Sequence, residues 1–473
     1  MTILTTISDL VLAFTNWVWG IPMLIWLVGG GIFLSFRMHF IQFTKLGFIL
    51  KNIIVKAFRN TGDGGKGRIS GFKAVTGALA STLGAGNIVG TALAIGYGGP
   101  GGVFWLWLTG LFASMVKYCK VVLGMKYRRR KDGQWFGGPQ YYLTDATGWK
   151  WMGLSYAFFG TITLFIAASA QVGSVVDTVE VMNVPRLPAT IVIIILAALI
   201  VIGGMTRLLD FTERIVPAMS VIYIIGGLAV ILLNIQALPA AFISIFRYAF
   251  TGRAAVGGFA GATVASCIRW GVARGIYSND AGTGVTTITH AAADVNHPVQ
   301  QGMWGVFEVF FDTIVVCSIT CFAILTTGVW TTDASTSVYT ITAFQQTLGN
   351  ALGGGIVSVA LALFCFTTAV AQILFGCDQL AKLFDEKARI PGRYAFLAFL
   401  LVGGIVGIEG MINYLDFFVC IYIAINMIGV YLCNGQIKEL TEEYFADPKR
   451  WETERWQPYV EMEKEDAKNA KEA

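Results

Sequence analysis

The chain has 473 residues, of which 55% are hydrophobic and only 13% are charged. A soluble domain carries roughly 25% charged residues, so this composition excludes a water-soluble protein and indicates an exterior that faces hydrocarbon. The net charge of +5 gives no argument for nucleic acid, because the basic residues lie in short loops between apolar segments. The 55 glycines, against an average near 7%, favour packed spanning helices over a β-barrel.

Eleven segments are apolar and long enough to be spanning helices, which need about 20 residues. In chain order they are 17–36, 76–96, 102–125, 152–182, 188–204, 213–235, 257–290, 302–328, 353–380, 394–411 and 412–434. The first lacks a small-residue cleavage site, so we expect a retained helix and not a signal peptide. The sequence thus predicts an all-α polytopic membrane protein.

Lysine and arginine gather in alternate loops. They are concentrated at 51–68, 126–131 and 382–393, whereas the long loop 330–352 has none. Cytoplasmic loops are enriched in these residues, so we predict an outside N-terminus and a cytoplasmic C-terminus. The charged composition after Gln436 indicates a solvated cytoplasmic tail without chemistry of its own.

The second span is interrupted by small and polar residues between Ser81 and Gly90. Each glycine costs a helix about 1 kcal/mol relative to alanine, which predicts a break near Gly84. Backbone groups freed inside a membrane persist where they line a cavity or bind a ligand. The half-helix after the break offers amides to a carboxylate, and the half before it offers carbonyls to a cation. Close helix packing through Gly86 and Gly90 is the alternative.

The seventh span repeats this signal between Arg274 and Gly284. Two interrupted segments five spans apart indicate an inverted five-helix repeat with a binding site at the midplane. We therefore divide the chain into an additional N-terminal helix (1–48), two repeats (76–235 and 257–434) and the tail (436–473).

Four motifs resemble the alanine or glycine:cation symporter family. They are Gly98–Trp107, Gly84–Gly90, Arg274–Gly282 and Phe364–Thr368, and the resemblance extends from the first span to about Gln436. It implies the leucine-transporter fold, a 5+5 inverted repeat with one extra N-terminal helix. It also implies a sodium:amino acid symporter in the cytoplasmic membrane of a bacterium or archaeon.

The resemblance further implies a sodium site. Its ligands would be the carbonyls of Ala80 and Leu83 and the hydroxyls of Thr367 and Thr368, with the carbonyl of Phe364. Sodium prefers oxygen ligands, and hydroxyls supply them without a buried net charge. The alternative is that both threonines bond to their own helix.

The implied substrate site joins the two interrupted spans to the fourth. Amides near Gly84 would hold the carboxylate, and Gln171 would line the pocket unless it makes only an interhelical hydrogen bond. The residues expected at the substrate are Thr82, Gly84, Ala85, Gly86, Asn87, Gln171, Tyr277, Ser278, Asn279, Thr368 and Gln372.

This chain departs from the family at two positions. Gln372 stands where the family carries a tryptophan, which predicts a substrate larger or more polar than alanine or glycine, such as an amide-bearing amino acid. Asp280 replaces the usual glutamate, and the sequence does not indicate its consequence.

Two acids in the eighth span, Glu308 and Asp312, share a helix face because they are four residues apart. A proton relay through these two acids is the alternative, and it would make the coupling ion a proton. The interpretation we favour is a structural pairing with Arg269 or Arg274. His290 flanks a loop, where we expect a gate or loop residue.

The energetics require only one sodium ion. A charge crossing about 100 mV gains about 2.3 kcal/mol, and a tenfold gradient adds roughly 1.4 kcal/mol. No Walker loop for ATP is present. The expected partners are an amino acid, sodium and the bilayer, with no nucleic acid and a monomeric protein. A passive channel is the second hypothesis, and no enzymatic constellation of histidine, acid and cysteine is expected.

Overall fold

The computed structural model describes residues 2–59, 69–131, 133–180, 183–252 and 262–472, and it is almost entirely helical. Within these residues, eight helices are long and apolar enough to cross a membrane. A ninth span is a bent pair, Gly71–Thr82 and Gly86–Gly98, whose halves meet at 54°. The predicted break in the second span is therefore present.

The first half of the chain consists of helices and one pair of short strands. They are α1 (Thr2–Val18), α2 (Ile21–Met23), η1 (Leu24–Gly29), α3 (Gly30–Arg37), α4 (Ile41–Thr44), α5 (Leu46–Arg59), α6 (Gly71–Thr82), η2 (Gly86–Gly90), α7 (Thr91–Gly98), α8 (Gly101–Lys126), β1 (Arg129–Lys131), β2 (Gln134–Phe136), α9 (Pro139–Thr147), α10 (Lys150–Glu180), α11 (Arg186–Val201), α12 (Gly204–Leu233), η3 (Ile235–Ala237) and α13 (Leu238–Thr251). The two strands pair antiparallel.

The second half is also helical and ends in three helices that follow the last span. Its elements are α14 (Val264–Asn279), α15 (Thr287–Ala291), α16 (Pro298–Val309), η4 (Phe310–Cys317), α17 (Ser318–Thr327), η5 (Val329–Thr331), η6 (Thr336–Val338), α18 (Tyr339–Leu348), α19 (Asn350–Leu383), η7 (Glu386–Ala388), α20 (Arg389–Leu432), α21 (Asn434–Ala446), α22 (Arg450–Thr453) and α23 (Gln457–Glu472).

One predicted span differs from the structure. The fifth, predicted over 188–204, is present as α11, an apolar helix of 16 residues. The seventh, predicted over 257–290, is not one helix: α14 ends at Asn279, and α15 begins at Thr287. Asp280 and Gly284 have φ of 52° and 78°, a left-handed conformation that a continuous helix cannot contain. Residues 257–261 lie outside the described part.

The tenth and eleventh spans form one bent element, α20. The bend is at Gly407, whose φ is 77°. The carboxylate of Asp177 accepts a hydrogen bond from the Ile408 amide at 3.0 Å. A Cβ at Gly407 would lie 2.8 Å from an oxygen of that carboxylate. Both the backbone conformation and the close approach therefore favour glycine here.

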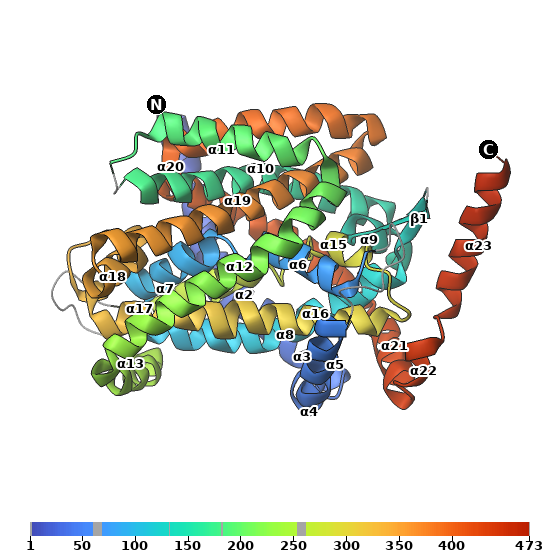
Figure 1. Ribbon diagram of the computed structural model, residues 1–473, viewed down its shortest axis with the longest axis horizontal. Coiled ribbons are helices and arrows are strands. Elements are labelled where there is room, and N and C mark those ends of the chain that lie inside the picture. The colour runs from blue at the N-terminus through green and yellow to red at the C-terminus, as the bar shows by residue number, and fades with distance from the viewer. Residues whose placement is uncertain (1, 60–68, 132, 181–182, 253–261, 473) are drawn as a thin grey trace.

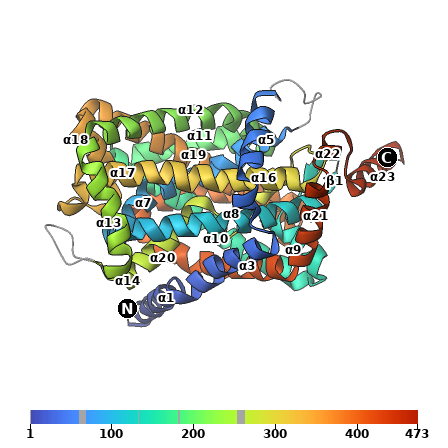
Figure 2. The same ribbon diagram turned by 90° about the horizontal axis from the view of Figure 1, so that it is seen from below.

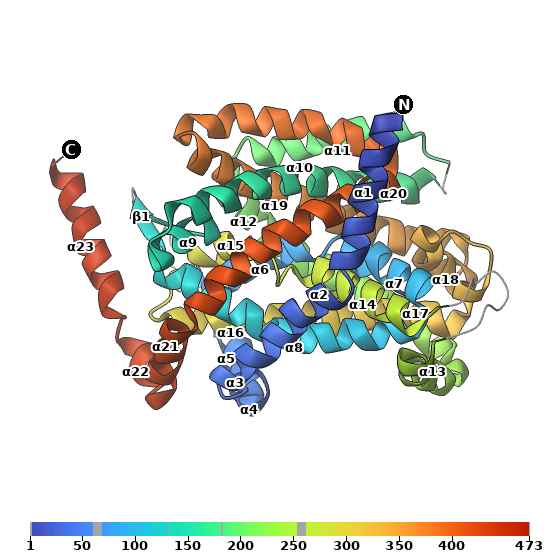
Figure 3. The ribbon, with the colours of Figure 1, turned by 180° about the vertical axis from the view of Figure 1, so that it is seen from behind.

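The long helices lie in two groups (Figure 1). One group packs α10 against α19 and α20, and the other packs α8 against α14 and α16, with the broken second span between them. The N-terminal helix lies outside these groups, where α1 and α20 contact each other (Figure 3). The broken span therefore contacts helices of both halves of the chain.

The helices after α20 are docked and not simply solvated. In α21, Ile437, Leu440 and Tyr444 are buried. Helix α23 stands beside the β1–β2 hairpin (Figures 1 and 2), where the Arg128 guanidinium lies 3.9 Å from the ring centres of both Trp135 and Tyr459.

The connection between α22 and α23 binds the part of the chain that directly follows α15. Arg455 forms ion pairs with Asp294 and Glu463, and the Trp456 amide donates to the Asn296 carbonyl at 2.9 Å. The predicted helical character of the tail is present, but the expectation that it is merely solvated is wrong, because aromatic and charged side chains fix it to the bundle.

Candidate ion and substrate site

The break in the second span brings helix-end carbonyls to α19. Helix α6 ends at Thr82, so the last carbonyls of this helix lack amide partners from a following turn. The Thr368 hydroxyl of α19 lies 2.9 Å from the Ala80 oxygen and 3.0 Å from the Leu83 oxygen. The structure thus brings together three of the predicted sodium ligands.

These oxygens fit a sodium ion. One hydroxyl proton can be donated to only one of the two carbonyls at a time, whereas a sodium ion between them would satisfy both. Every group in the set is a neutral oxygen, which suits a hard monovalent cation. The Thr367 hydroxyl donates to the Phe364 carbonyl of its own helix at 3.0 Å, so this residue keeps the local bond that was the alternative interpretation.

Gly84 is the point at which the ion and substrate regions meet. A Cβ on Gly84 would lie 2.7 Å from the Thr368 hydroxyl oxygen and 2.9 Å from Gln171 Oε1. The absence of a side chain therefore allows α10 and α19 to approach the broken backbone together.

The amides predicted to bind a carboxylate are paired with side-chain oxygens. The Gly84 amide donates to Asn87 Oδ1 at 3.0 Å, and the Ala85 amide donates to Gln171 Oε1 at 2.9 Å. The Gln171 amide group also donates to the Tyr277 hydroxyl at 3.4 Å. Gln171 is thus held between the second and seventh spans, and a bound carboxylate would replace these side-chain oxygens.

A buried cavity lies beside this contact. Of the predicted substrate residues, Thr82, Gly86, Gln171, Tyr277 and Gln372 line it. The Oε1 atom of Gln372 is buried and has no hydrogen-bond partner in the described part of the protein. Asp280 also lines the cavity and bonds through Oδ1 to the Thr283 hydroxyl, while its Oδ2 has no partner there.

Three predicted substrate residues form a separate polar cluster. Asn87 Nδ2 donates to Asp312 Oδ1 at 2.7 Å and to the Ser278 hydroxyl at 2.9 Å. The Asn279 amide group donates to the Thr313 hydroxyl at 3.1 Å. These side chains therefore face η4, and none of them lines the cavity.

Two lysines occupy the interruption of the seventh span. Lys117 of α8 donates to the Asn279 carbonyl at 3.1 Å, and Lys120 donates to the carbonyls of Ala281 and Gly282. These carbonyls, freed by the interruption of the seventh span, are thus bound by ammonium groups of the protein. Sequence reasoning missed both lysines; their position inside an apolar span was the available signal.

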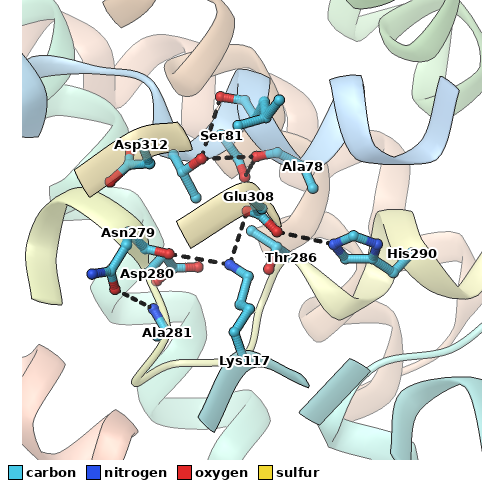
Figure 4. Close-up of polar contacts among 12 residues, drawn as sticks. Ala78, Ser81, Lys117, Asn279, Asp280, Ala281, Thr286, His290, Glu308 and Asp312 are labelled. Atoms are coloured by element: carbon cyan, nitrogen blue, oxygen red, sulfur yellow. Dashed lines mark hydrogen bonds and ion pairs between the residues drawn. The ribbon is translucent and has the colours of Figure 1, made fainter. Parts of the chain in front are cut away.

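The expected partners of Glu308 were wrong. Glu308 pairs with Lys117 Nζ at 2.9 Å and with His290 Nε2 at 3.0 Å (Figure 4), while Arg274 pairs with Asp416. His290, expected beside a loop, is completely buried. The reason is the unwound segment, which turns α15 inward against α6 and α8.

Comparison with known proteins identifies the family. A sequence model of the sodium:alanine symporter family matches residues 4–457. The chain belongs to this family. The sodium/alanine symporter AgcS of Methanococcus maripaludis is 35% identical to it over 92% of this chain and 97% of the relative. An uncharacterized transporter of Bacillus subtilis, YflA, is 38% identical over 91% of this chain and 92% of the relative.

Solved structures agree with this membership at the level of the fold. The crystal structure of MhsT in complex with L-phenylalanine matches with a TM-score of 0.57 and 12% identity, over 77% of this chain and 89% of that one. The sodium:alanine symporter family member described here is thus an all-α membrane transport protein with the leucine-transporter fold.

Proposed function

We propose that this protein couples sodium influx to the uptake of a small neutral amino acid by alternating access. The observation that carries the proposal is the Thr368 hydroxyl between the Ala80 and Leu83 carbonyls at the end of a broken spanning helix. It supports a sodium site built from neutral oxygens, directly beside amides that suit a carboxylate.

We further propose that the substrate is larger or more polar than alanine or glycine, for example an amide-bearing amino acid. Gln372 and Asp280 each place a buried, unpartnered oxygen at the cavity. An unpaired buried acceptor is unfavourable, so a substrate with a donor near these oxygens would be stabilised. The Asp280 carboxylate also offers an acceptor for the α-ammonium group.

We propose that the protein lies in the cytoplasmic membrane as a monomer, with its N-terminus outside and its tail in the cytoplasm. The concentration of basic residues in alternate loops supports this orientation. A fluorescent protein fused after the tail should therefore fluoresce in bacterial cells, since such fusions mature in the cytoplasm. An outside tail would leave the fusion dark.

The deciding experiment is uptake of labelled amino acids into proteoliposomes under an imposed sodium or proton gradient. Sodium should drive accumulation in the wild type, and Thr368→Val, which keeps the shape but removes the hydroxyl, should lose at least about tenfold in apparent sodium affinity. The matched control is Thr342→Val, whose hydroxyl donates to the Val338 carbonyl one turn earlier in the chain.

Three outcomes would contradict the proposal. Undiminished sodium dependence in Thr368→Val would remove this site. Accumulation driven by protons alone would make the protein a proton symporter. Uptake that continues at the same rate and extent without any ion gradient would make it a passive facilitator.

A further inference from the structure

Asp312 is a buried carboxylate without a cationic partner. Its side chain is fully buried in η4, and no basic group of the described residues lies within ion-pairing distance of it. Its partners are neutral: Asn87 Nδ2 at 2.7 Å, the Ser278 hydroxyl at 2.6 Å and the Thr313 hydroxyl at 3.0 Å. An ionised carboxylate inside a membrane protein is unfavourable unless its charge is compensated.

The charged side chains around Asp312 already have other partners. Glu308, one turn before Asp312, pairs with Lys117 and bonds to His290, while Lys120 binds carbonyls and Arg274 pairs with Asp416. This buried set contains three basic side chains and four carboxylates. The cations are Lys117, Lys120 and Arg274, and the acids are Asp280, Glu308, Asp312 and Asp416. With His290 counted as neutral, one negative charge therefore remains. Asp280 and Asp312 are both hydrogen-bonded only by neutral groups, but the charges of Lys117 and Lys120 act on the Asp280 carboxylate, whereas the charged group that acts on Asp312 is the acid Glu308.

The orientation of these donors favours a proton over a metal ion as the compensating charge. Asn87 presents its nitrogen to Asp312 because its Oδ1 accepts from the Gly84 amide. A sodium ion here would need the amide oxygen instead. A proton on Asp312 has a ready acceptor in the Ser278 hydroxyl, which would then donate to Cys317 Sγ at 3.2 Å.

The backbone at this contact is unusual on both sides. Asn87 lies in η2 and Asp312 in η4, and both segments are π-helical. Such segments are rare and occur frequently at functional sites. The hydrogen bond between these two side chains joins the interrupted second span to the eighth span.

Asn87 also connects Asp312 to the proposed substrate site. Its Oδ1 accepts from the Gly84 amide, which is one of the amides proposed to hold the substrate carboxylate. A second carboxylate arriving at this helix start would disfavour an ionised Asp312 through like-charge repulsion. Binding of protons and of substrate would then favour each other, since linkage is reciprocal.

We propose that Asp312 is a proton-binding site that takes up one proton from water when an amino acid carboxylate binds at the start of the second half of the broken span. The inference rests on the proposed function, because it needs an amino acid at Gly84. It adds a protonation step that sodium coupling alone does not require.

The experiment is titration calorimetry of the purified protein at saturating sodium. L-Alanine and L-glutamine are titrated separately, in phosphate and in Tris at the same neutral pH. The two buffers have different ionisation enthalpies, so the difference in heat gives the number of protons bound per amino acid. We expect up to one proton per amino acid in the wild type. The apparent Kd of the wild type for the amino acid should increase with pH, by up to about tenfold per pH unit.

Two variants locate the proton. Asp312→Asn is isosteric, and its heat should not depend on the buffer. Asp333→Asn removes an exposed aspartate from a loop and should behave as the wild type does. If Asp312→Asn does not fold, Ser278→Ala serves instead: it removes a donor to the carboxylate and should move the pH range of proton uptake upward.

Buffer-independent heat in the wild type would overturn the assignment, as would equal proton uptake in Asp312→Asn. A sodium ion at Asp312 would also overturn it; its signature is a steep, cooperative sodium dependence that becomes hyperbolic in Asp312→Asn. Buffer-independent heat leaves the proposed function intact, whereas the absence of sodium-driven amino acid uptake into proteoliposomes contradicts the proposed function itself.

Discussion

The ammonium nitrogen of Lys117 lies 2.9 Å from the carboxylate of Glu308, and both side chains are completely buried. Removing one partner leaves an uncompensated buried charge, which costs about 3–5 kcal/mol. We therefore expect Lys117→Met and Glu308→Gln each to lower the thermal unfolding temperature in detergent. The double variant should be more stable than the sum of the single effects predicts. Strict additivity would show that the two charges do not interact.

Gly84 is expected to tolerate no side chain. In Gly84→Ala the new Cβ would lie 2.7 Å from the Thr368 hydroxyl oxygen, so α19 must move away from the Ala80 and Leu83 carbonyls. Sodium-driven uptake should decrease at least about tenfold. Gly355→Ala, in α19 with open space around its Cβ position, should retain uptake and gain up to about 1 kcal/mol of helix stability. Equal uptake by the two variants would contradict this role.

The amide of Gln372 should select the substrate. Gln372→Met keeps the length of the side chain but removes the unpartnered acceptor at the cavity. We expect L-glutamine and L-asparagine to compete about tenfold less well for uptake in this variant, while competition by L-alanine changes little. A variant with unchanged preference, or a wild type that takes up only alanine and glycine, would refute the selection.

The docking of α21 and α22 should depend on pH through His297. Burial lowers the pKa of His297 to about 3, among the rings of Tyr444 and Trp451. Glu443 Oε2, 3.7 Å from Nε2, opposes this effect, but its side chain is 41% exposed and is screened by water. His297 is therefore neutral when docked, whereas in the undocked chain it binds a proton below about pH 6.5.

The sign of the effect follows from these two states. Docking is fully stable above about pH 6.5 and weakens as the pH falls toward 3, because the undocked state binds the extra proton. Hydrogen exchange of residues 437–453 should therefore be faster at pH 5 than at pH 7.5, after correction for the intrinsic rate. His297→Gln should show a smaller change. Equal protection at the two pH values would argue against a neutral His297.

The sequence predicted the features that are local along the chain. The break at Gly84 and the hydroxyl pair at Thr367 and Thr368 depend on neighbouring residues and on family motifs, and the structure brings Thr368 to the predicted carbonyls. The partner of Glu308 was predicted wrongly. A charged residue in an apolar helix gives no indication of which distant helix it faces, and Lys117 meets Glu308 only because α8 packs against α16.

The docked tail also offers a way to observe the protein at work. Arg455 and Trp456 bind the chain directly after α15, so a displacement of α15 must carry α23 with it or release it. All eight cysteines are buried, and Lys464 is exposed on α23. A single dye attached at Lys464→Cys would therefore report such a displacement by its change in environment, without a probe in the path of the substrate.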